Sequence, residues 1–302
     1  MKKIFFLIVG CVSTFAQISA DYYGSYEGCA NCFGFESVLT FDVGGGYRSD
    51  NLKWKRIVSP TEEVTEQWKN IGMGLVETNA RFLACEHYLF KADFDCAWFD
   101  QSGHQTYDAS TGSVLTEKLS SRTKGQAYNL SGALGYQFNF FCSRLSLAPL
   151  VGYSYNYQRF KNNQYNNELD TPETETSNHN RYKYRWNGPW VGAGISVTPY
   201  CDISFFFDYA FHWTKLQGNI GEHFSDIFTP AHVNASNGFG NEYIAGIEYV
   251  FCDGWFLGAK LDYKQFWGNK AHYHADGDEE NTPVHDLSWN SYNITLDIGY
   301  NF

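Results

Sequence analysis

The chain has 302 residues and is rich in aromatic side chains, with 25 Phe, 22 Tyr and 9 Trp against 7 Pro. Aromatic residues make up 19% of the chain, well above ordinary usage, and charged residues make up 18%, below the roughly 25% of a soluble domain. This composition excludes disorder. A mean hydropathy of −0.40, without a long apolar run after the N-terminus, excludes a bundle of membrane-spanning helices and favours a transmembrane β-barrel.

The N-terminus has the pattern of a secretory signal peptide. Lys2 and Lys3 precede an apolar run over residues 4–9, and small residues follow up to Ala20. A lipoprotein signal ending at Cys11 is a weaker alternative, because the apolar core before that cysteine would be very short. Loss of two lysines makes the formal net charge of −11 more negative, which argues against nucleic acid as a partner.

We therefore expect three parts. Residues 1–20 form a signal peptide, residues 21–36 form a periplasmic segment that contains cysteines, and residues 37–302 form an outer-membrane β-barrel.

Ten segments alternate apolar residues with polar or small ones, as in a strand whose two faces contact lipid and lumen. The C-terminal segment, residues 292–302, shows this most clearly. A soluble β-sandwich would also alternate, but its apolar faces would rarely be so aromatic at both strand ends. The expected strands lie around residues 39–47, 71–75, 82–98, 128–140, 145–155, 191–197, 203–213, 243–251, 255–263 and 292–302.

Short turns and long polar segments separate these strands in strict alternation. In outer-membrane barrels the short turns are periplasmic, the long loops are external, and an even strand number returns both termini to the periplasm. The sequence therefore predicts an all-β fold, a ten-stranded antiparallel barrel. The predicted external loops are residues 49–66, 100–125, 159–181, 217–238 and 269–286.

Charged residues of both signs fall on the face that is expected to point inward. A barrel of this size is largely filled by its own side chains, so a pore through one monomer would be narrow or plugged. The predicted inward residues are Asp42, His87, Lys91, Asp93, Asp95, Asp208, His212, Glu248, Lys260, Asp262, Lys264 and Asp297.

One stretch resembles a known family. Residues 182–192, a strand ending in Trp213 and the run from Gly221 to Phe224 resemble the second half of the omptins, which are ten-stranded outer-membrane proteases. The Trp-Asn-Gly-Pro-Trp run at 186–190 resembles more closely the outer-membrane proteins and porins of amoeba-associated chlamydiae. Phe302 resembles the terminal assembly signal of bacterial outer-membrane barrels, which implies the barrel assembly machinery and outer-membrane lipid as partners.

The resemblance implies an omptin-type site only in part. Omptins activate water between an Asp pair and an Asp/His pair on facing walls, which is general-base chemistry. His223 matches the family's His, but Gly221 stands where the family has Asp. Asp93 and Asp95 are candidates for the facing pair. The broken dyad disfavours catalysis, and the alternative is that the two acids are lumen residues and His223 an exposed loop histidine.

Cysteines gather on the expected periplasmic side, and only Cys96 faces lipid. An odd number in an exported protein leaves one thiol unpaired or pairs it between chains. Local disulfides are one possibility. The resemblance to chlamydial porins implies another, namely links to other envelope proteins or to a second copy of the chain. The disulfide candidates are Cys29, Cys32, Cys85, Cys142, Cys201 and Cys252.

Metal binding is not expected, although the last polar segment contains His272, His274 and Asp276, because no spacing fixes a coordination geometry. No cofactor motif is found. The sequence thus predicts an outer-membrane barrel with a structural or porin-like envelope role. The rival interpretations are an omptin-type endopeptidase and a surface adhesin acting through its loops.

Overall fold

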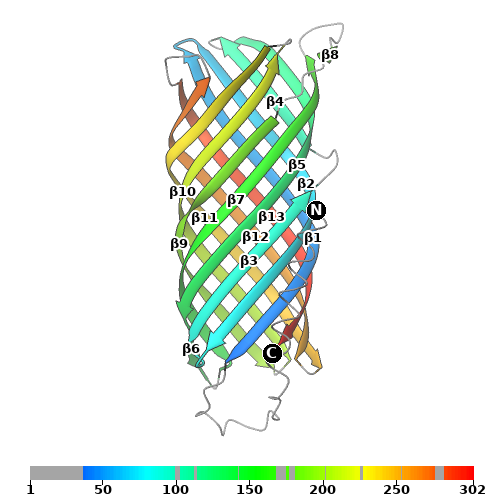
Figure 1. Cartoon of the computed structure of the whole chain (residues 1–302), viewed down its shortest axis with the longest axis vertical. Coiled ribbons are helices and arrows are strands. Elements are labelled where there is room, and N and C mark those ends of the chain that lie inside the picture. The colour runs from blue at the N-terminus through cyan, green and yellow to red at the C-terminus, as the bar shows by residue number, and fades with distance from the viewer. Residues whose placement is uncertain are drawn as a thin grey trace.

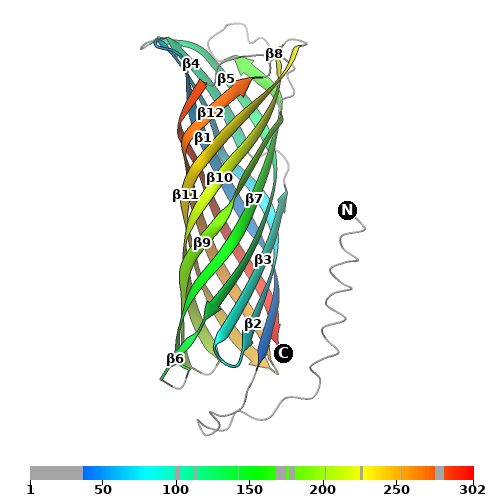
Figure 2. The ribbon, with the colours of Figure 1, turned by 60° about the vertical axis from the view of Figure 1, so that its left-hand side comes forward.

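The alternating segments form long strands that close into one antiparallel barrel (Figures 1 and 2). The computed structural model describes residues 37–98, 103–111, 114–141, 143–167, 175–176, 181–200, 202–224, 227–252, 254–275 and 282–302. The predicted signal peptide (1–20) and periplasmic segment (21–36) lie outside this range. Among the described residues, no helix has the length and apolarity needed to cross a membrane.

The wall has ten positions. The segments β3 and β4 share one position because both pair with β2 and β5, and β5 and β6 share another because both pair with β7. The strands are β1 (Val38–Ser59), β2 (Glu62–Ala84), β3 (Tyr88–Trp98), β4 (Gly103–Thr111), β5 (Val114–Tyr136), β6 (Phe138–Phe140), β7 (Leu145–Asn167), the short β8 (Glu175–Thr176) beside β7, β9 (Arg181–Tyr200), β10 (Ile203–Phe224), β11 (Ile227–Cys252), β12 (Trp255–Ala275) and β13 (Thr282–Asn301).

The first and last strands close the barrel. Antiparallel pairing of β1 with β13 runs from Thr40 opposite Asn301 to Arg56 opposite Val284. At the end of the barrel where the chain terminates, the amide of Phe302 donates to the carbonyl of Leu39 at 2.7 Å. The predicted ten-stranded barrel is therefore confirmed.

The five predicted external loops are mostly strand, and that prediction is wrong. The hairpin of β1 and β2 pairs out to Ser59 and Glu62, so most of residues 49–66 lies in the wall. Most described residues of the other four segments likewise belong to β4, β5, β7 and β9 to β13. The predicted strand 82–98 is in fact divided by a turn at residues 85–87.

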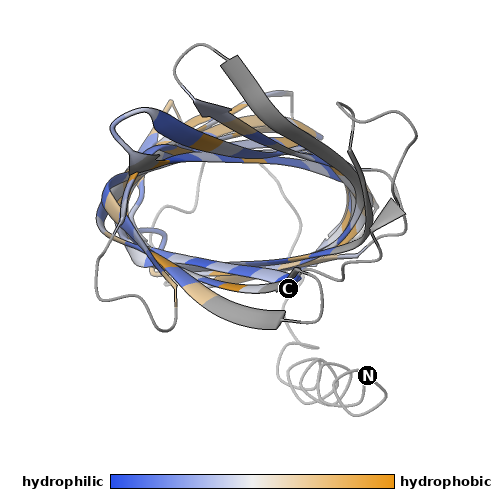
Figure 3. Ribbon diagram, turned by 90° about the horizontal axis from the view of Figure 1, so that it is seen from above, coloured by the Kyte–Doolittle hydropathy of each residue, from blue (hydrophilic) through white to orange (hydrophobic). Residues whose placement is uncertain are grey.

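The reason for this error is that the apolar residues of each strand point outward in one half of the barrel and inward in the other half. We call this change the inversion of the alternation. In the half nearest Phe302, large apolar side chains such as Val43, Tyr47 and Leu257 are exposed on the outer wall, where lipid covers them. In the other half the apolar residues point inward: Leu52 and Trp54 are buried while their neighbours point outward. Figure 3 shows hydrophilic and hydrophobic residues alternating around the wall.

Aromatic residues mark the outer edge of the lipid-facing band, as expected at a membrane interface. The exposed aromatics at this edge include Tyr47, Trp98, Tyr128, Tyr153, Trp213 and Tyr292. Everything beyond this girdle stands outside the membrane, and we call it the extramembrane half. The inversion also explains why Ile71, Met73 and Leu75, which identified a strand in the sequence, are buried inside rather than exposed to lipid.

Candidate functional site

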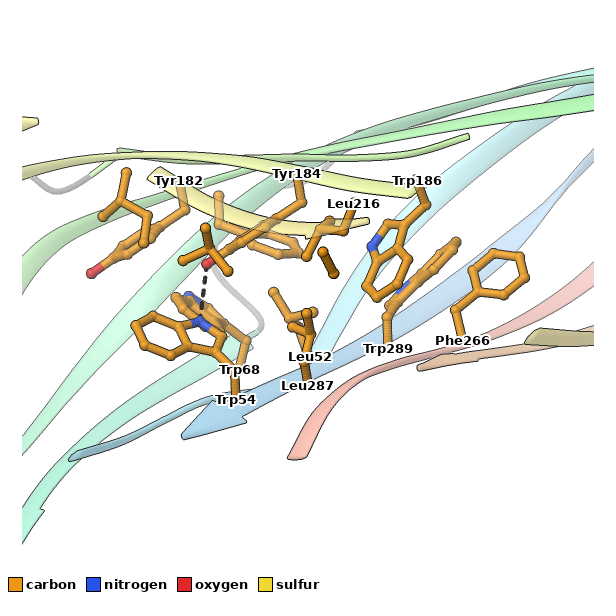
Figure 4. Close-up of a cluster of buried hydrophobic side chains, with 14 of the residues drawn as sticks. Leu52, Trp54, Trp68, Tyr182, Tyr184, Trp186, Leu216, Phe266, Leu287 and Trp289 are labelled. Atoms are coloured by element: carbon orange, nitrogen blue, oxygen red, sulfur yellow. Dashed lines mark hydrogen bonds between the residues drawn. The ribbon is translucent and has the colours of Figure 1, made fainter. Parts of the chain in front are cut away.

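The lumen of the extramembrane half is filled by a cluster of aromatic and aliphatic side chains, which we call the aromatic plug (Figure 4). Its members come from strands all around the wall, so they meet only because the barrel closes. Its largest residues are Trp54, Trp68, Phe160, Tyr182, Tyr184, Trp186, Phe266, Tyr273 and Trp289.

Contacts across the lumen hold the plug together. The indole Nε1 of Trp54 on β1 donates to the hydroxyl of Tyr184 on β9 at 3.2 Å, and these strands lie five positions apart in the ring of ten. The rings of Trp68 and Tyr182 lie 4.8 Å apart, and those of Trp186 and Trp289 lie 6.2 Å apart. Because all four tryptophans have 0% exposure, water is excluded between the opposite walls.

A buried ion-pair network lies directly against the plug. Arg48, whose guanidinium is 5.7 Å from the ring of Trp289, contacts Asp50 at 2.9 Å and Asp95 at 3.1 Å. Asp50 also accepts from Gln158 at 2.9 Å. The arrangement satisfies a cation that would be very costly to bury alone.

A second group links four strands beside the first. Lys264 lies 2.9 Å from Glu242 and 3.3 Å from Asp262. His212 bonds Glu242 through Nε2 at 3.0 Å and Ser154 through Nδ1 at 3.1 Å. The order serine, histidine, carboxylate is that of a nucleophilic triad, but Ser154 is only 4% exposed and lies under the plug. Such burial suits a structural bond better than contact with a substrate.

Further towards the end that contains Phe302, ion pairs continue to cross the lumen. Lys260 contacts Glu77 at 2.7 Å, and Lys91 on β3 contacts Asp208 on β10 at 2.6 Å. The prediction that charged side chains bond across the lumen is therefore confirmed for these pairs.

Sequence reasoning missed four charged members of these networks. Arg48, Asp50 and Glu242 lie just beyond the ends of the strands predicted from lipid-facing residues, and Glu77 lies two residues after the predicted strand 71–75, whose apolar residues are buried rather than exposed to lipid. Continuing the period of two past the aromatic girdle would have found Arg48, Asp50 and Glu242.

The structure does not bring the omptin-type candidates together. The carboxylate of Asp95 is bound by Arg48 and by Asn129 at 2.8 Å, inside the buried network. His223 lies near the tip of β10, opposite Phe228. His223 lies eleven residues beyond His212, a member of the buried networks, and this separation is on the order of 35 Å along the strand. Asp93 shares the inward face of β3 with Asp95, and Gly221 lies opposite Pro230.

Two of the described cysteines are free thiols. Cys85 is exposed in the turn between β2 and β3, and Cys96 lies on the outer face of β3, as predicted. Cys252 ends β11. Cys29, Cys32, Cys142 and Cys201 lie outside the described residues, so the disulfide candidates remain predictions.

The last polar segment is largely strand rather than loop. His272 and His274 belong to β12, and Asp276 lies outside the described part of the chain. Within the described ranges, no group of three or more His, Cys, Asp or Glu side chains is placed to hold a metal ion.

Fold and lumen together define a closed outer-membrane β-barrel. The chain matches the family model described as Protochlamydia outer membrane protein over residues 42–302, and it belongs to this family. It is accordingly a protein of the outer membrane. No curated protein sequence matches it.

Solved structures similar to the chain are also outer-membrane barrels. The outer membrane protease OmpT from Escherichia coli matches with a TM-score of 0.75 and 10% sequence identity, covering 88% of this chain and 97% of that one. A major outer membrane protein from Thermus thermophilus matches with a TM-score of 0.37 and 13% identity, covering 88% and 100%. At this identity the likeness to OmpT concerns the fold alone, and it confirms the omptin-like architecture.

Proposed function

We propose that this outer-membrane barrel has a structural role in the cell envelope and that its lumen does not conduct ions. The observation that supports the proposal is the aromatic plug, in which side chains from opposite walls touch at 0% exposure. A porin-like role would need a continuous aqueous path, and open channels are found in barrels with many more strands. Below the plug, ion pairs such as that of Lys91 with Asp208 narrow the lumen again.

Recording of purified protein in a planar lipid bilayer tests this proposal. We expect no unitary current steps from the wild-type barrel. The control is Trp213→Ala, which changes the lipid-facing girdle and leaves the lumen as it is. Stable steps of one size in both proteins would favour the porin-like interpretation and contradict the closed lumen.

The rival endopeptidase interpretation lacks a comparable observation. Asp95 forms an ion pair with Arg48, and Gly221 has no carboxylate that could orient His223. We expect no cleavage of basic peptides by the refolded protein. Robust cleavage that disappears in both His223→Ala and Asp95→Ala would contradict the structural role and restore the protease.

The structural role includes a disulfide component on the periplasmic side. Cys85 is an exposed free thiol in the turn between β2 and β3. We expect this turn to face the periplasm, a compartment that favours disulfide formation. Non-reducing gels of envelopes, prepared with free thiols trapped at lysis, should show high-mass species that reductant collapses. Cys85→Ser and Cys29→Ser/Cys32→Ser should each remove part of them. A monomer band alone without reductant would refute disulfide-linked partners.

Assembly is proposed to depend on Phe302, which carries the resemblance to the terminal signal of other barrels. Its ring also packs against Tyr300, with centroids 4.7 Å apart. Deletion of Phe302 should lower the fraction of heat-modifiable barrel in the outer membrane, whereas Phe302→Tyr should not. Equal fractions would argue against a contribution from this residue.

A further inference from the structure

Six basic side chains gather on one outer face of the extramembrane half, across β5, β7 and β9. The residues that alternate with them, such as Phe160, Tyr182 and Tyr184, are buried in the plug, so the basic side chains point away from the lumen. We call this group the basic wall. It consists of Lys124, Arg159, Lys161, Arg181, Lys183 and Arg185.

The strand register places these like charges side by side. Lys161 lies opposite Lys124 on one side and Arg181 on the other, and Arg159 lies opposite Lys183. Like charges directly opposite on neighbouring strands destabilise a sheet. The pKa of Lys161 is lowered, first by the charge of Arg159 and then by burial, Arg181 and Lys124.

Among the described residues, no carboxylate relieves the repulsion between five of these cations. Within the described residues, no ion pair joins Arg159, Lys161, Arg181, Lys183 or Arg185 to an acid. By contrast, Lys55 on the opposite wall is paired with Glu63 at 3.0 Å. Five outward cations without an acidic partner among the described residues, on a chain whose formal net charge is −11, form an electrostatic footprint for an anionic partner.

The height of the basic wall argues against lipid headgroups as that partner. Val191 is the outermost exposed large apolar residue of β9, and Arg181 lies ten residues further out along the same strand. At about 3.3 Å per residue and a tilt of roughly 40°, Arg181 stands about 25 Å above the apolar band. The headgroup layer is only roughly 5–8 Å thick on each side, so the upper rows face the aqueous exterior.

We propose that the basic wall binds a linear sulfated polysaccharide at the cell surface. Sulfate groups stay ionised at all physiological pH values and recur along such a chain, so several can contact cations spread over three strands. Arginine guanidinium groups bind planar oxyanions through two hydrogen bonds, and lysines add point charges. The rigid strands hold the cations in place, so little ordering of the protein is needed on binding.

Binding of the purified, refolded full chain to heparin tests the proposal. The variant Lys161→Gln/Arg181→Gln/Lys183→Gln removes three cations from the basic wall. The matched control Lys53→Gln/Lys55→Gln/Lys69→Gln removes three from β1 and β2. We expect the first variant to lose at least tenfold in heparin affinity and the control to change less than twofold, with wild-type binding that weakens as salt rises.

Four outcomes would overturn the proposal: equal losses in the two variants, no loss in the basic-wall variant, equally tight binding of desulfated heparin, and binding only to vesicles that contain lipopolysaccharide.

The heat-dependent gel shift of unboiled protein reports whether each variant folds. If the basic-wall variant fails to fold, acylation of wild-type protein replaces it. Heparin should then protect Lys161 and Lys183 but not Lys53, and absence of protection would refute binding.

Discussion

The ion pairs of Arg48 show how much one buried residue contributes. Its guanidinium is the cation that Asp50 and Asp95 share at the base of the plug, so removing it leaves two buried carboxylates uncompensated. Breaking such a group typically costs about 3–5 kcal/mol.

We therefore expect Arg48→Met to lower the midpoint of urea unfolding, followed by the heat-dependent gel shift. Lys55→Met is the control, because its exposed ion pair with Glu63 contributes about 0–1 kcal/mol. Adding Asp50→Asn and Asp95→Asn to Arg48→Met should recover part of the loss, since no buried charge then remains. Equal midpoints for the two single variants would contradict this account.

Two outward lysines should differ in reactivity. The pKa of Lys55 is raised, chiefly by its hydrogen bond to Glu63, whereas that of Lys161 is lowered, chiefly by Arg159. Only the neutral amine is acylated, so at pH 8 Lys161 carries more of the reactive form. Mass spectrometry after brief acetylation should show faster modification of Lys161, with a smaller difference at high salt. Faster modification of Lys55 would count against the unrelieved repulsion in the basic wall.

At the scale of the strand, β9 and β10 test the inversion of the alternation. Trp186 on β9 is fully buried in the plug, while Trp213 on β10 is 49% exposed on the lipid-facing side. Truncation of a buried tryptophan typically costs about 3–5 kcal/mol because a cavity remains. We expect Trp186→Ala to lower the urea midpoint much more than Trp213→Ala. The reverse order would mean that the plug is not a packed core.

The half of each strand that faces lipid could be predicted from the sequence, because a strand in lipid must present apolar side chains outward. The other half could not. There, Leu52 and Trp54 alternate with Asn51, Lys53 and Lys55, which is the same period of two in a less apolar form. Because the sequence does not show which residues face the lumen, the polar residues of this half suggested loops. The inward positions of Asp95, His212 and Lys264 could be predicted, because these residues alternate with lipid-facing ones.

The pairings across the lumen lay beyond sequence reasoning. Trp54 meets Tyr184 only because the register between all ten strands sets which residues face one another. A shift of one residue in any pairing would turn a face of that strand outward. Those contacts are therefore a property of the closed ring and not of any single strand.

At the scale of the whole molecule, the extramembrane half should resist proteolysis. Lys53, Lys183 and Lys215 lie in strands that pair on both sides. Trypsin should leave the bonds after these lysines intact in the folded barrel and cut them after heat unfolding, as peptide mapping would show. Cleavage after Lys53 in the folded protein would support the loop first expected at residues 49–66.

The inversion of the alternation also fixes the position of the barrel along the membrane normal. If the molecule moved outward by one pair of residues, a ring of apolar side chains would enter water, at roughly 1.5–3 kcal/mol for each one exposed. If it sank by the same step, outward lysines such as Lys53 and Lys215 would approach hydrocarbon. The barrel therefore has one vertical position in the bilayer. A change in membrane thickness would deform the surrounding lipid and leave the plug, which stands above it, untouched.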